Sequence, residues 1–213
     1  MSGTPSPRLA VAVVVLPSAA VARRAIALNR RLEDRTLRLG PRAWPHLTLA
    51  MACVDREAIA AIASQLRGQV ADERPFDVTL TRTAIVPGAA HVTAWYEAAR
   101  TRELQRWHRR AVTLLEPHRR PGPAARDFAV PRGGTVSASA RRWVRRYAHD
   151  AAGPRFRPHI TLGYGAAPSD AGLPLVFRAG RIALCHLGDH CTCARLLAEF
   201  RLAARPRRPD KLA

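Results

Sequence analysis

Two nearly identical pentapeptides constrain this 213-residue chain more than any other feature, because one lies in each half of the sequence. They are Pro45-His46-Leu47-Thr48-Leu49 and Pro158-His159-Ile160-Thr161-Leu162. Such a repeat is typical of two equivalent structural units. We therefore expect two pseudo-symmetric lobes around a central cleft, each contributing one copy of the motif.

Each pentapeptide is typical of the start of a β-strand, because a proline comes first and apolar β-forming residues follow. Residues two apart on a strand share a face, so the His and Thr of each copy point away from their apolar neighbours. Two such strands side by side would surround one anion with two imidazoles and two hydroxyls. One imidazole could then accept a proton while the other donates one, as acid-base cleavage of a phosphodiester requires, and the threonines would hold phosphate oxygens.

Hydrophobic periodicity and turn residues in the rest of the chain predict an α+β fold in a single bilobal domain over residues 1–213. The lobes are expected at about 9–100 and 101–203. Strands are expected at residues 9–16, 46–54, 76–86, 91–99, 159–164, 175–187 and 191–202. Helices are expected at residues 18–39, 55–70, 101–118 and 137–152, with Ser18 and Thr101 at two of their starts. The Pro- and Gly-rich segment 119–135 predicts a mobile loop, and the basic tail 204–213 predicts disorder.

The composition indicates a phosphate-rich partner. The chain has 35 Lys and Arg against 16 Asp and Glu, a formal net charge of +19 and a pI near 11.6. Such a surface favours RNA above other partners, although an Arg-rich and Ala-rich composition can also reflect a genome-wide bias. No apolar run approaches the ~20 residues of a membrane span. The apolar residues 9–17 are interpreted as a buried strand rather than as the core of a signal peptide. Four cysteines do not make a disulfide scaffold, so we expect a cytoplasmic protein, and nothing implies a protein partner.

The paired motifs resemble those of the two-histidine (2H) phosphoesterase superfamily, and most closely its bacterial 2′-5′ RNA ligase and cyclic phosphodiesterase branch. The resemblance spans about residues 9–202. It implies a bilobal, pseudo-two-fold α+β fold, with antiparallel sheets lining a central cleft and helices outside. It also implies hydrolysis of 2′,3′-cyclic phosphate on RNA ends without a metal or other cofactor, and reversible 2′-5′ joining in some members.

The resemblance assigns roles to the residues of the two motifs. His46 and Thr48 would form one catalytic half-site, and His159 and Thr161 the other. In this superfamily one histidine activates the attacking water or hydroxyl, and the other protonates the leaving ribose oxygen. The sequence does not say which histidine has which role.

One position departs from the pattern of several RNA ligase-like members, which carry a basic residue five positions after the second histidine. This chain has Tyr164 there, and Arg155 or Arg157 could replace the charge. Trp44 could stack on a base, with packing as the alternative, and His190 could lie at the rim of the cleft. These five residues are the candidates for substrate binding.

Other histidines and cysteines offer rival interpretations. His91-Val92-Thr93 and His190-Cys191-Thr192 are spare His-x-Thr copies, but neither has the preceding proline or the following leucine. A group of cysteines and histidines between residues 185 and 193 could bind zinc. No Cys-x-x-Cys pair is present, however, and the alternative is a hairpin whose cysteines are buried. The residues concerned are Cys185, His186, His190, Cys191 and Cys193. Three histidines on predicted helices are expected to lie in solvent: His108, His118 and His149.

The sequence thus favours an RNA-processing enzyme, a phosphoesterase acting on RNA ends through His46 and His159. A module that binds RNA ends without turnover is one alternative. A phosphodiesterase for a small cyclic nucleotide or ADP-ribose cyclic phosphate is another.

Overall fold

The strands that the structure describes join into one sheet. This computed structural model describes residues 6–88, 91–131, 134–166, 170 and 172–203. Its strands are β1 (Arg8–Val15), β2 (Leu47–Asp55), β3 (Phe76–Pro87), β4 (Val92–Ala98), β5 (His159–Tyr164), β6 (Leu175–Ala179), β7 (Arg181–Leu187) and β8 (Cys193–Arg201). Its helices are α1 (Ala19–Arg31), α2 (Ala58–Val70), α3 (Arg102–Leu115) and α4 (Ala138–Asp150). Short 3-10 turns are η1 (Glu116–His118), η2 (Ala125–Asp127), η3 (Gly153–Arg155) and η4 (Asp189–Cys191).

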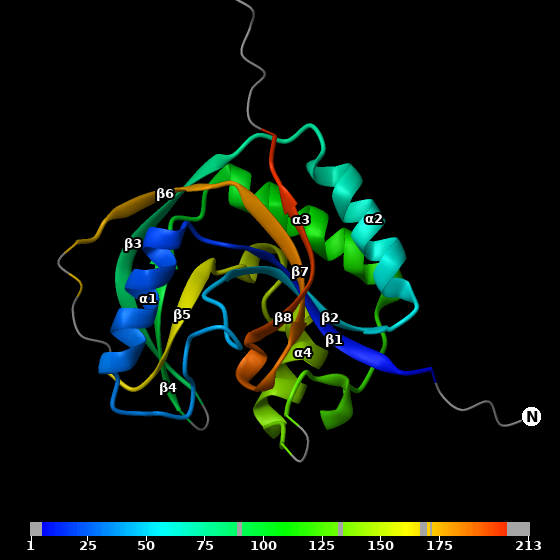
Figure 1. Cartoon of the computed structure of the whole chain (residues 1–213), viewed down its shortest axis with the longest axis horizontal. Coiled ribbons are helices and arrows are strands. Elements are labelled where there is room, and N and C mark those ends of the chain that lie inside the picture. Colours follow the sequence, from blue (N-terminus) through cyan, green and yellow to red (C-terminus); the bar gives the residue numbers. More distant parts are fainter. Residues whose placement is uncertain (1–5, 89–90, 132–133, 167–169, 171, 204–213) are drawn as a thin grey trace, which may run out of the picture.

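The strand order places the two motif strands next to each other at the centre of the sheet. The order is β6-β3-β4-β5-β2-β1-β7-β8, every pairing is antiparallel, and the sheet curls (Figure 1). One half-sheet is β6-β3-β4-β5 and the other is β2-β1-β7-β8. Each half-sheet therefore contains strands from both halves of the chain, and the half-sheets do not coincide with the residue ranges 9–100 and 101–203 expected for the lobes.

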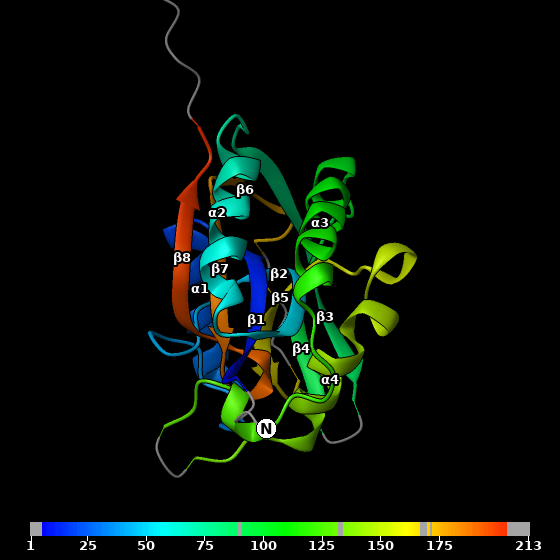
Figure 2. The same cartoon turned by 90° about the vertical axis from the view of Figure 1, so that its right-hand side faces the viewer.

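The helices cross between the two half-sheets. Helix α1 lies between β1 and β2 in the chain but contacts β5, whereas α3 and α4 lie between β4 and β5 but contact β2. Figure 2 shows α1 on one side of the molecule and α3 and α4 on the other. The predicted helix starts at Ser18 and Thr101 are confirmed, because their side chains accept backbone N–H groups of the first turn. Within the described residues, no helix is both long enough and apolar enough to cross a membrane.

The apolar residues of both pentapeptides anchor the motif strands in the core. Leu47, Leu49, Ile160 and Leu162 are completely buried, and each such side chain contributes about 1.5–3 kcal/mol to stability. Strand β1, which lies beside β2, is buried from Leu9 to its end. The buried strand predicted at residues 9–16 is thereby confirmed.

Buried polar side chains tie the crossing helices to equivalent points of the two motif strands. Asn29 on α1 donates from Nδ2 to the carbonyl oxygen of Leu162 (2.7 Å). On the other side, His108 on α3 contacts the carbonyl oxygen of Leu49 through Nδ1 (2.6 Å), and Tyr147 on α4 donates to the same oxygen (3.2 Å). Leu49 and Leu162 occupy the same position of the two pentapeptides, so each motif strand is fixed at the same point.

His108 is therefore not in solvent, and that prediction was wrong. The side chain is buried, stacks on Phe156 with ring centroids 4.0 Å apart, and accepts the Gly153 N–H at Nε2 (3.0 Å). Nδ1 then carries the ring hydrogen and donates to the β2 carbonyl. Burial lowers the pKa of this imidazole and keeps it neutral.

Three predicted element boundaries were also wrong. The helix expected at 18–39 ends at Arg31, because Asn29 bonds the carbonyl of Leu37 (2.9 Å) and the N–H of Leu39 (3.0 Å) and holds that segment in an irregular turn. The strand expected at 175–187 is broken at Gly180 into β6 and β7, which pair with different strands, β3 and β1. Strand β8 begins at Cys193 because η4 precedes it.

The segment 119–135 has little regular structure, as predicted, but its described part is packed rather than free. Asp127 and Phe128 are buried, and Ala129 donates to the carbonyl of Leu187 in β7 (2.8 Å). Residues 132–133 and the tail 204–213 lie outside the described residues.

Candidate active site

The sheet brings the four motif side chains to one face. Strands β2 and β5 pair with Leu47 opposite Ile160. In that antiparallel register each histidine lies opposite the threonine of the other motif, and opposite Cβ atoms are about 4.5–5.5 Å apart. All four side chains are partly exposed, whereas the paired apolar residues are buried. The opposed pairs are His46 with Thr161, and Thr48 with His159.

Both imidazoles are held in the same way. Nδ1 of His46 lies 2.7 Å from the carbonyl oxygen of Trp44, and Nδ1 of His159 lies 2.7 Å from that of Arg157. A carbonyl can only accept a hydrogen bond, so each Nδ1 carries the ring hydrogen. Each Nε2 is then left with a lone pair for proton transfer.

Burial lowers the pKa of both imidazoles below the ordinary value of 6.5. At His159, desolvation, with added contributions from the charges of His46 and Arg157, lowers the pKa to about 4. Both rings are therefore neutral at pH 7 in the free protein. A bound phosphate would raise these pKa values, because a nearby anion favours the protonated imidazole.

Strand β4 adds two residues that sequence reasoning missed. Trp95 lies opposite Thr161 and Glu97 lies opposite His159, so both share the face of the motif side chains. The indole stacks on the His159 ring, with centroids 4.2 Å apart and an interplanar angle of 27°. Alternation within the predicted strand 91–99 could have placed these two residues on one face, but only the register of β4 against β5 shows which face it is.

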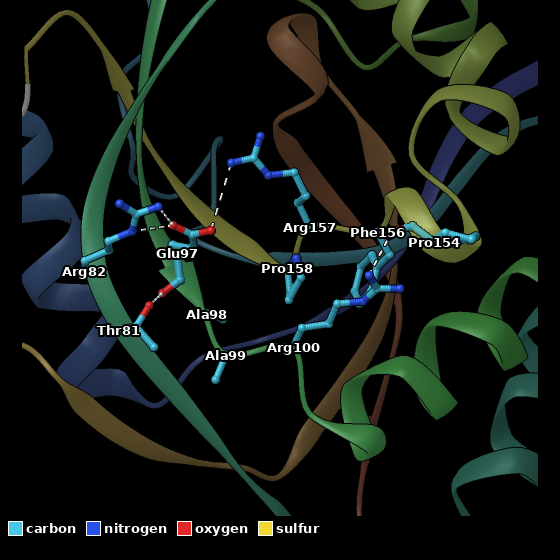
Figure 3. A pocket seen from close by; sticks show the side chains of 10 residues that line it. All are labelled: Thr81, Arg82, Glu97, Ala98, Ala99, Arg100, Pro154, Phe156, Arg157 and Pro158. Atoms are coloured by element: carbon cyan, nitrogen blue, oxygen red, sulfur yellow. Dashed lines mark hydrogen bonds and ion pairs between the residues drawn. The ribbon is translucent and has the colours of Figure 1, made fainter.

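Arg157 joins this group, whereas Arg155 does not. The guanidinium carbon of Arg157 lies 5.2 Å from the centre of the Trp95 ring, and one of its nitrogens lies 4.0 Å from Glu97. Its side chain borders a pocket of about 390 Å³ (Figure 3). Arg155 lies exposed in η3 and is not among the residues that line this pocket.

Tyr164 lies at the other end of the same face. A bulge in the pairing of β4 with β5 places Tyr164 opposite Thr93, on the side of Trp95. Its hydroxyl contacts Nδ1 of His190 (2.9 Å), and its ring stacks on His91 with centroids 4.4 Å apart. Burial, with nearby acidic groups, raises the pKa of Tyr164 to about 12, so the phenol is neutral. The two spare His-x-Thr copies thus meet here, beside the four motif residues rather than among them.

Trp44 is 37% exposed at the entry to β2. Its indole N–H donates to the carbonyl of Pro41 (2.8 Å), and its backbone N–H donates to the carbonyl of Cys193 (3.0 Å). Its backbone therefore positions His46, while part of the ring faces solvent.

The cysteines near the chain end are free thiols. Cys185 and Cys193 are buried neighbours, and Cys191 is partly buried in η4. In the part of the chain that the structure describes, no three or more His, Cys, Asp or Glu side chains are grouped so that they could hold a metal ion.

Comparison with known proteins agrees with this geometry. A model of the 2′-5′ RNA ligase superfamily matches residues 17–184, and the chain belongs to that superfamily. A search of curated proteins gave no significant match.

Solved structures show the same fold. The chain is similar to TT0787 of Thermus thermophilus, with 18% identity, a TM-score of 0.60, and 93% of this chain and 100% of that chain covered. It is also similar to E. coli LigT complexed with NADP+, with 17% identity, a TM-score of 0.55, and 92% and 98% covered. LigT complexed with 3′-AMP gives the same identity and TM-score, with 92% and 99% covered. The predicted α+β fold of the 2H phosphoesterase type is confirmed.

Proposed function

We propose that this protein is a phosphoesterase that opens 2′,3′-cyclic phosphates at RNA ends by two-histidine acid-base catalysis, without a metal. The observation that carries the proposal is the pairing of β2 and β5, which gathers two imidazoles with free Nε2 atoms and two threonines on one face.

The proposed reaction uses the difference between the two imidazoles. His159, whose pKa burial lowers to about 4, takes the part of the neutral base in this proposal, and His46 takes that of the protonated acid. Nε2 of His159 accepts a proton from water as the water oxygen bonds to phosphorus. The bond from phosphorus to one ribose oxygen breaks, and that oxygen takes the proton from His46. Thr48 and Thr161 donate hydrogen bonds to the non-bridging phosphate oxygens. With the 5′-hydroxyl of a second RNA in place of water, the same ring opening, with the 3′ oxygen leaving, would join the two ends through a 2′-5′ linkage, and its reverse would cleave that linkage to give the cyclic phosphate.

Charge and relatives support an RNA end as the substrate. The net charge of +19 attracts phosphate-rich polymers. Structures of E. coli LigT have been solved with 3′-AMP and with phosphate, which are ligands of the same chemical class. The free thiols fit a reducing compartment, and we propose the cytoplasm as the place of action.

The test is incubation with an RNA that ends in a 2′,3′-cyclic phosphate, in the presence of EDTA. Wild-type protein should open the ring, and His46→Ala and His159→Ala should each slow opening by at least ~100-fold, as expected for loss of a general acid or base. His149→Ala is the control, because that exposed imidazole contacts Arg146 and Asp150 of its own helix α4. Opening that survives either substitution would exclude the mechanism. Resolving the product as a 2′- or 3′-monophosphate identifies the ribose oxygen that leaves.

A further inference from the structure

The two ends of the catalytic face differ in charge. We call the catalytic face the side of β4, β5 and β2 that carries Trp95, Glu97 and the four motif residues. At its Tyr164 end each imidazole already faces a carboxylate: His91 lies 3.4 Å from Asp34, and His190 lies 3.3 Å from Asp189. Any positive charge on these rings is balanced, so this end offers little attraction to a second phosphate.

The Tyr164 end is also crossed by a contact between distant parts of the sheet. Strands β2 and β1 lie between β5 and β7, yet the Tyr164 hydroxyl meets His190 in the turn between β7 and β8. The side chain of His190 is only 13% exposed there. Its backbone has a φ of 57°, a left-handed conformation that is uncommon outside glycine and that this contact helps to hold. Side chains that already contact one another thus occupy this end of the face.

The opposite end opens into the pocket of Figure 3, which we call the arginine pocket. It is bordered by the guanidinium groups of Arg82, Arg100 and Arg157 and by one carboxylate, Glu97. Arg82 donates to Glu97 through Nε (2.7 Å), and Arg100 donates only to the neutral carbonyl oxygens of Gly153 (2.9 Å) and Pro154 among its described partners. Three positive charges thus face one negative charge.

The arginine pocket lies beside the motif residues. Glu97 lies opposite His159 in the sheet, and Arg82 lies opposite Glu97, so these three residues form a row. Arg157 fixes His159 through its carbonyl oxygen while its side chain borders the pocket. Apolar surface from Ala99, Pro154 and Pro158 also lines it. A cationic border with apolar walls suits a nucleotide, and about 390 Å³ lies within the size range of ligand sites.

We propose that the arginine pocket binds the nucleotide unit on the 5′ side of the terminal one, with its phosphate at Arg157 and Arg82. The preferred substrate is then an RNA strand of at least two nucleotides rather than a cyclic mononucleotide. This inference rests on the proposed function, since it takes the terminal cyclic phosphate to lie between His46 and His159. Because the excess positive charge lies at the arginine pocket and not at the Tyr164 end, the strand leaves the site through the arginine pocket.

The experiment compares two substrates with the same terminal nucleoside: 2′,3′-cyclic AMP and a triadenylate with a 5′-hydroxyl and a terminal 2′,3′-cyclic phosphate. The measured quantity is the ratio of their kcat/KM values, which cancels changes in the chemical step. The wild-type ratio should favour the triadenylate by at least about tenfold, the factor that one charge-assisted hydrogen bond to phosphate supplies. The triadenylate should also lose activity more steeply with added salt, because it makes more phosphate contacts.

Matched variants locate the effect. Arg157→Gln and Arg82→Gln should each bring the ratio towards 1 and reduce the difference in salt dependence. Arg178→Gln is the control, because Arg178 forms a similar exposed cross-strand pair, with Asp77 of β3 (3.2 Å), outside the arginine pocket. It should leave the ratio unchanged. Thermal unfolding of each variant confirms that the fold is intact.

Each outcome decides the question. Equal kcat/KM for the two substrates in wild-type protein would overturn the inference and leave the proposed function standing. A preference for the triadenylate that persists in both pocket variants would overturn the role of the arginine pocket. If neither substrate is opened, the proposed function itself fails, and this inference fails with it.

Discussion

The two half-sites share their backbone geometry and differ in what surrounds their imidazoles. Each histidine follows a proline, bonds the carbonyl oxygen two residues earlier at 2.7 Å, and starts a strand whose apolar residues are buried. Only His159 stacks on an indole, that of Trp95, and has Glu97 opposite it on the neighbouring strand. Its pKa is lowered to about 4. The repeated motif sets where the reactive groups lie, and the unrepeated strand β4 gives only one of the two imidazoles an aromatic and an acidic neighbour.

This difference bears on the proposed reaction, which is asymmetric although the two half-sites are nearly alike. Proton transfer from water to a leaving oxygen needs one neutral and one protonated imidazole. Two identical environments would leave the position of the single proton undecided. The indole of Trp95 lies against the His159 ring only, and desolvation by burial is the largest cause of the lowered pKa of that ring.

The largest effect is expected when both histidines are removed. Each single alanine variant should lose about 10²–10⁴-fold in kcat, and the double variant His46→Ala/His159→Ala should be no slower than the slower single variant, because the two groups act in one step. Single-turnover opening of a cyclic phosphate RNA measures all three. If the loss in the double variant equals the product of the two single losses, the two histidines act independently, and a single step that uses both is excluded.

The next effect concerns stability and the helices that hold the two strands. Asn29→Ala and His108→Ala should each lower the free energy of unfolding by about 2–4 kcal/mol, because each leaves buried polar groups without partners and a cavity. Asn29→Ala should cost more, since its amide makes three hydrogen bonds and the His108 ring makes two. Urea unfolding provides the measurement. A loss below about 1 kcal/mol for both would show that the crossing helices do not hold the motif strands through these bonds.

The threonines test the symmetric part of the site. Thr48→Val and Thr161→Val keep the shape of the side chain and remove a hydroxyl, so each should lower kcat/KM by about 10–100-fold, the worth of a hydrogen bond to a charged group. Similar losses at both positions would support equal phosphate contacts. Retention of full activity by one variant would place the phosphate against the other threonine alone.

The smallest effect is a shift in pH dependence. Both imidazole pKa values lie below 6.5 in the free protein, so kcat/KM should rise as pH falls from neutrality, because more of the pair becomes singly protonated. It should fall again near pH 4, where His159 also becomes protonated. The maximum should therefore lie between about 4 and 6.5.

Trp95→Leu sharpens the same measurement. Removing the indole admits water to the His159 ring, which weakens desolvation and moves the lower pKa upward by about one unit. The pH profile of kcat/KM for the variant shows the shift. An unchanged acidic limb would mean that Trp95 is not what separates the two half-sites.

The sequence was sufficient for the motif strands because their signals are local. A proline, an alternating pattern and a buried apolar pair lie within each five-residue stretch, and the structure places both copies side by side. The contribution of Trp95 and Glu97 could not be predicted in this way. It depends on the register between β4 and β5, and a bulge in that pairing also decides that Tyr164 shares their face.

Other errors had different physical causes. His108 shares one face of its helix with three buried residues, Leu104, Ala111 and Leu115, so helical spacing could have predicted its burial. The arginines next to it in the sequence favoured a solvent-exposed position instead. The break at Gly180 has no such signal. Apolar residues continue on both sides, and only the distant partners β3 and β1 make β6 and β7 separate strands.

The exchange of strands between the half-sheets also fixes when this fold can form. One edge of β3 pairs with β6, and one edge of β1 pairs with β7. Neither edge can pair until residues beyond 174 have been synthesised. During synthesis the ribosome must release most of the chain before either half-sheet can close, and until then β1 and β3 present open edges. Long-range pairings of this kind slow folding, because the entropy cost of bringing distant segments together comes before the contacts between them can stabilise the chain. The strand exchange that joins the two halves of the chain around one site therefore delays the appearance of that site until β6 and β7 have been synthesised.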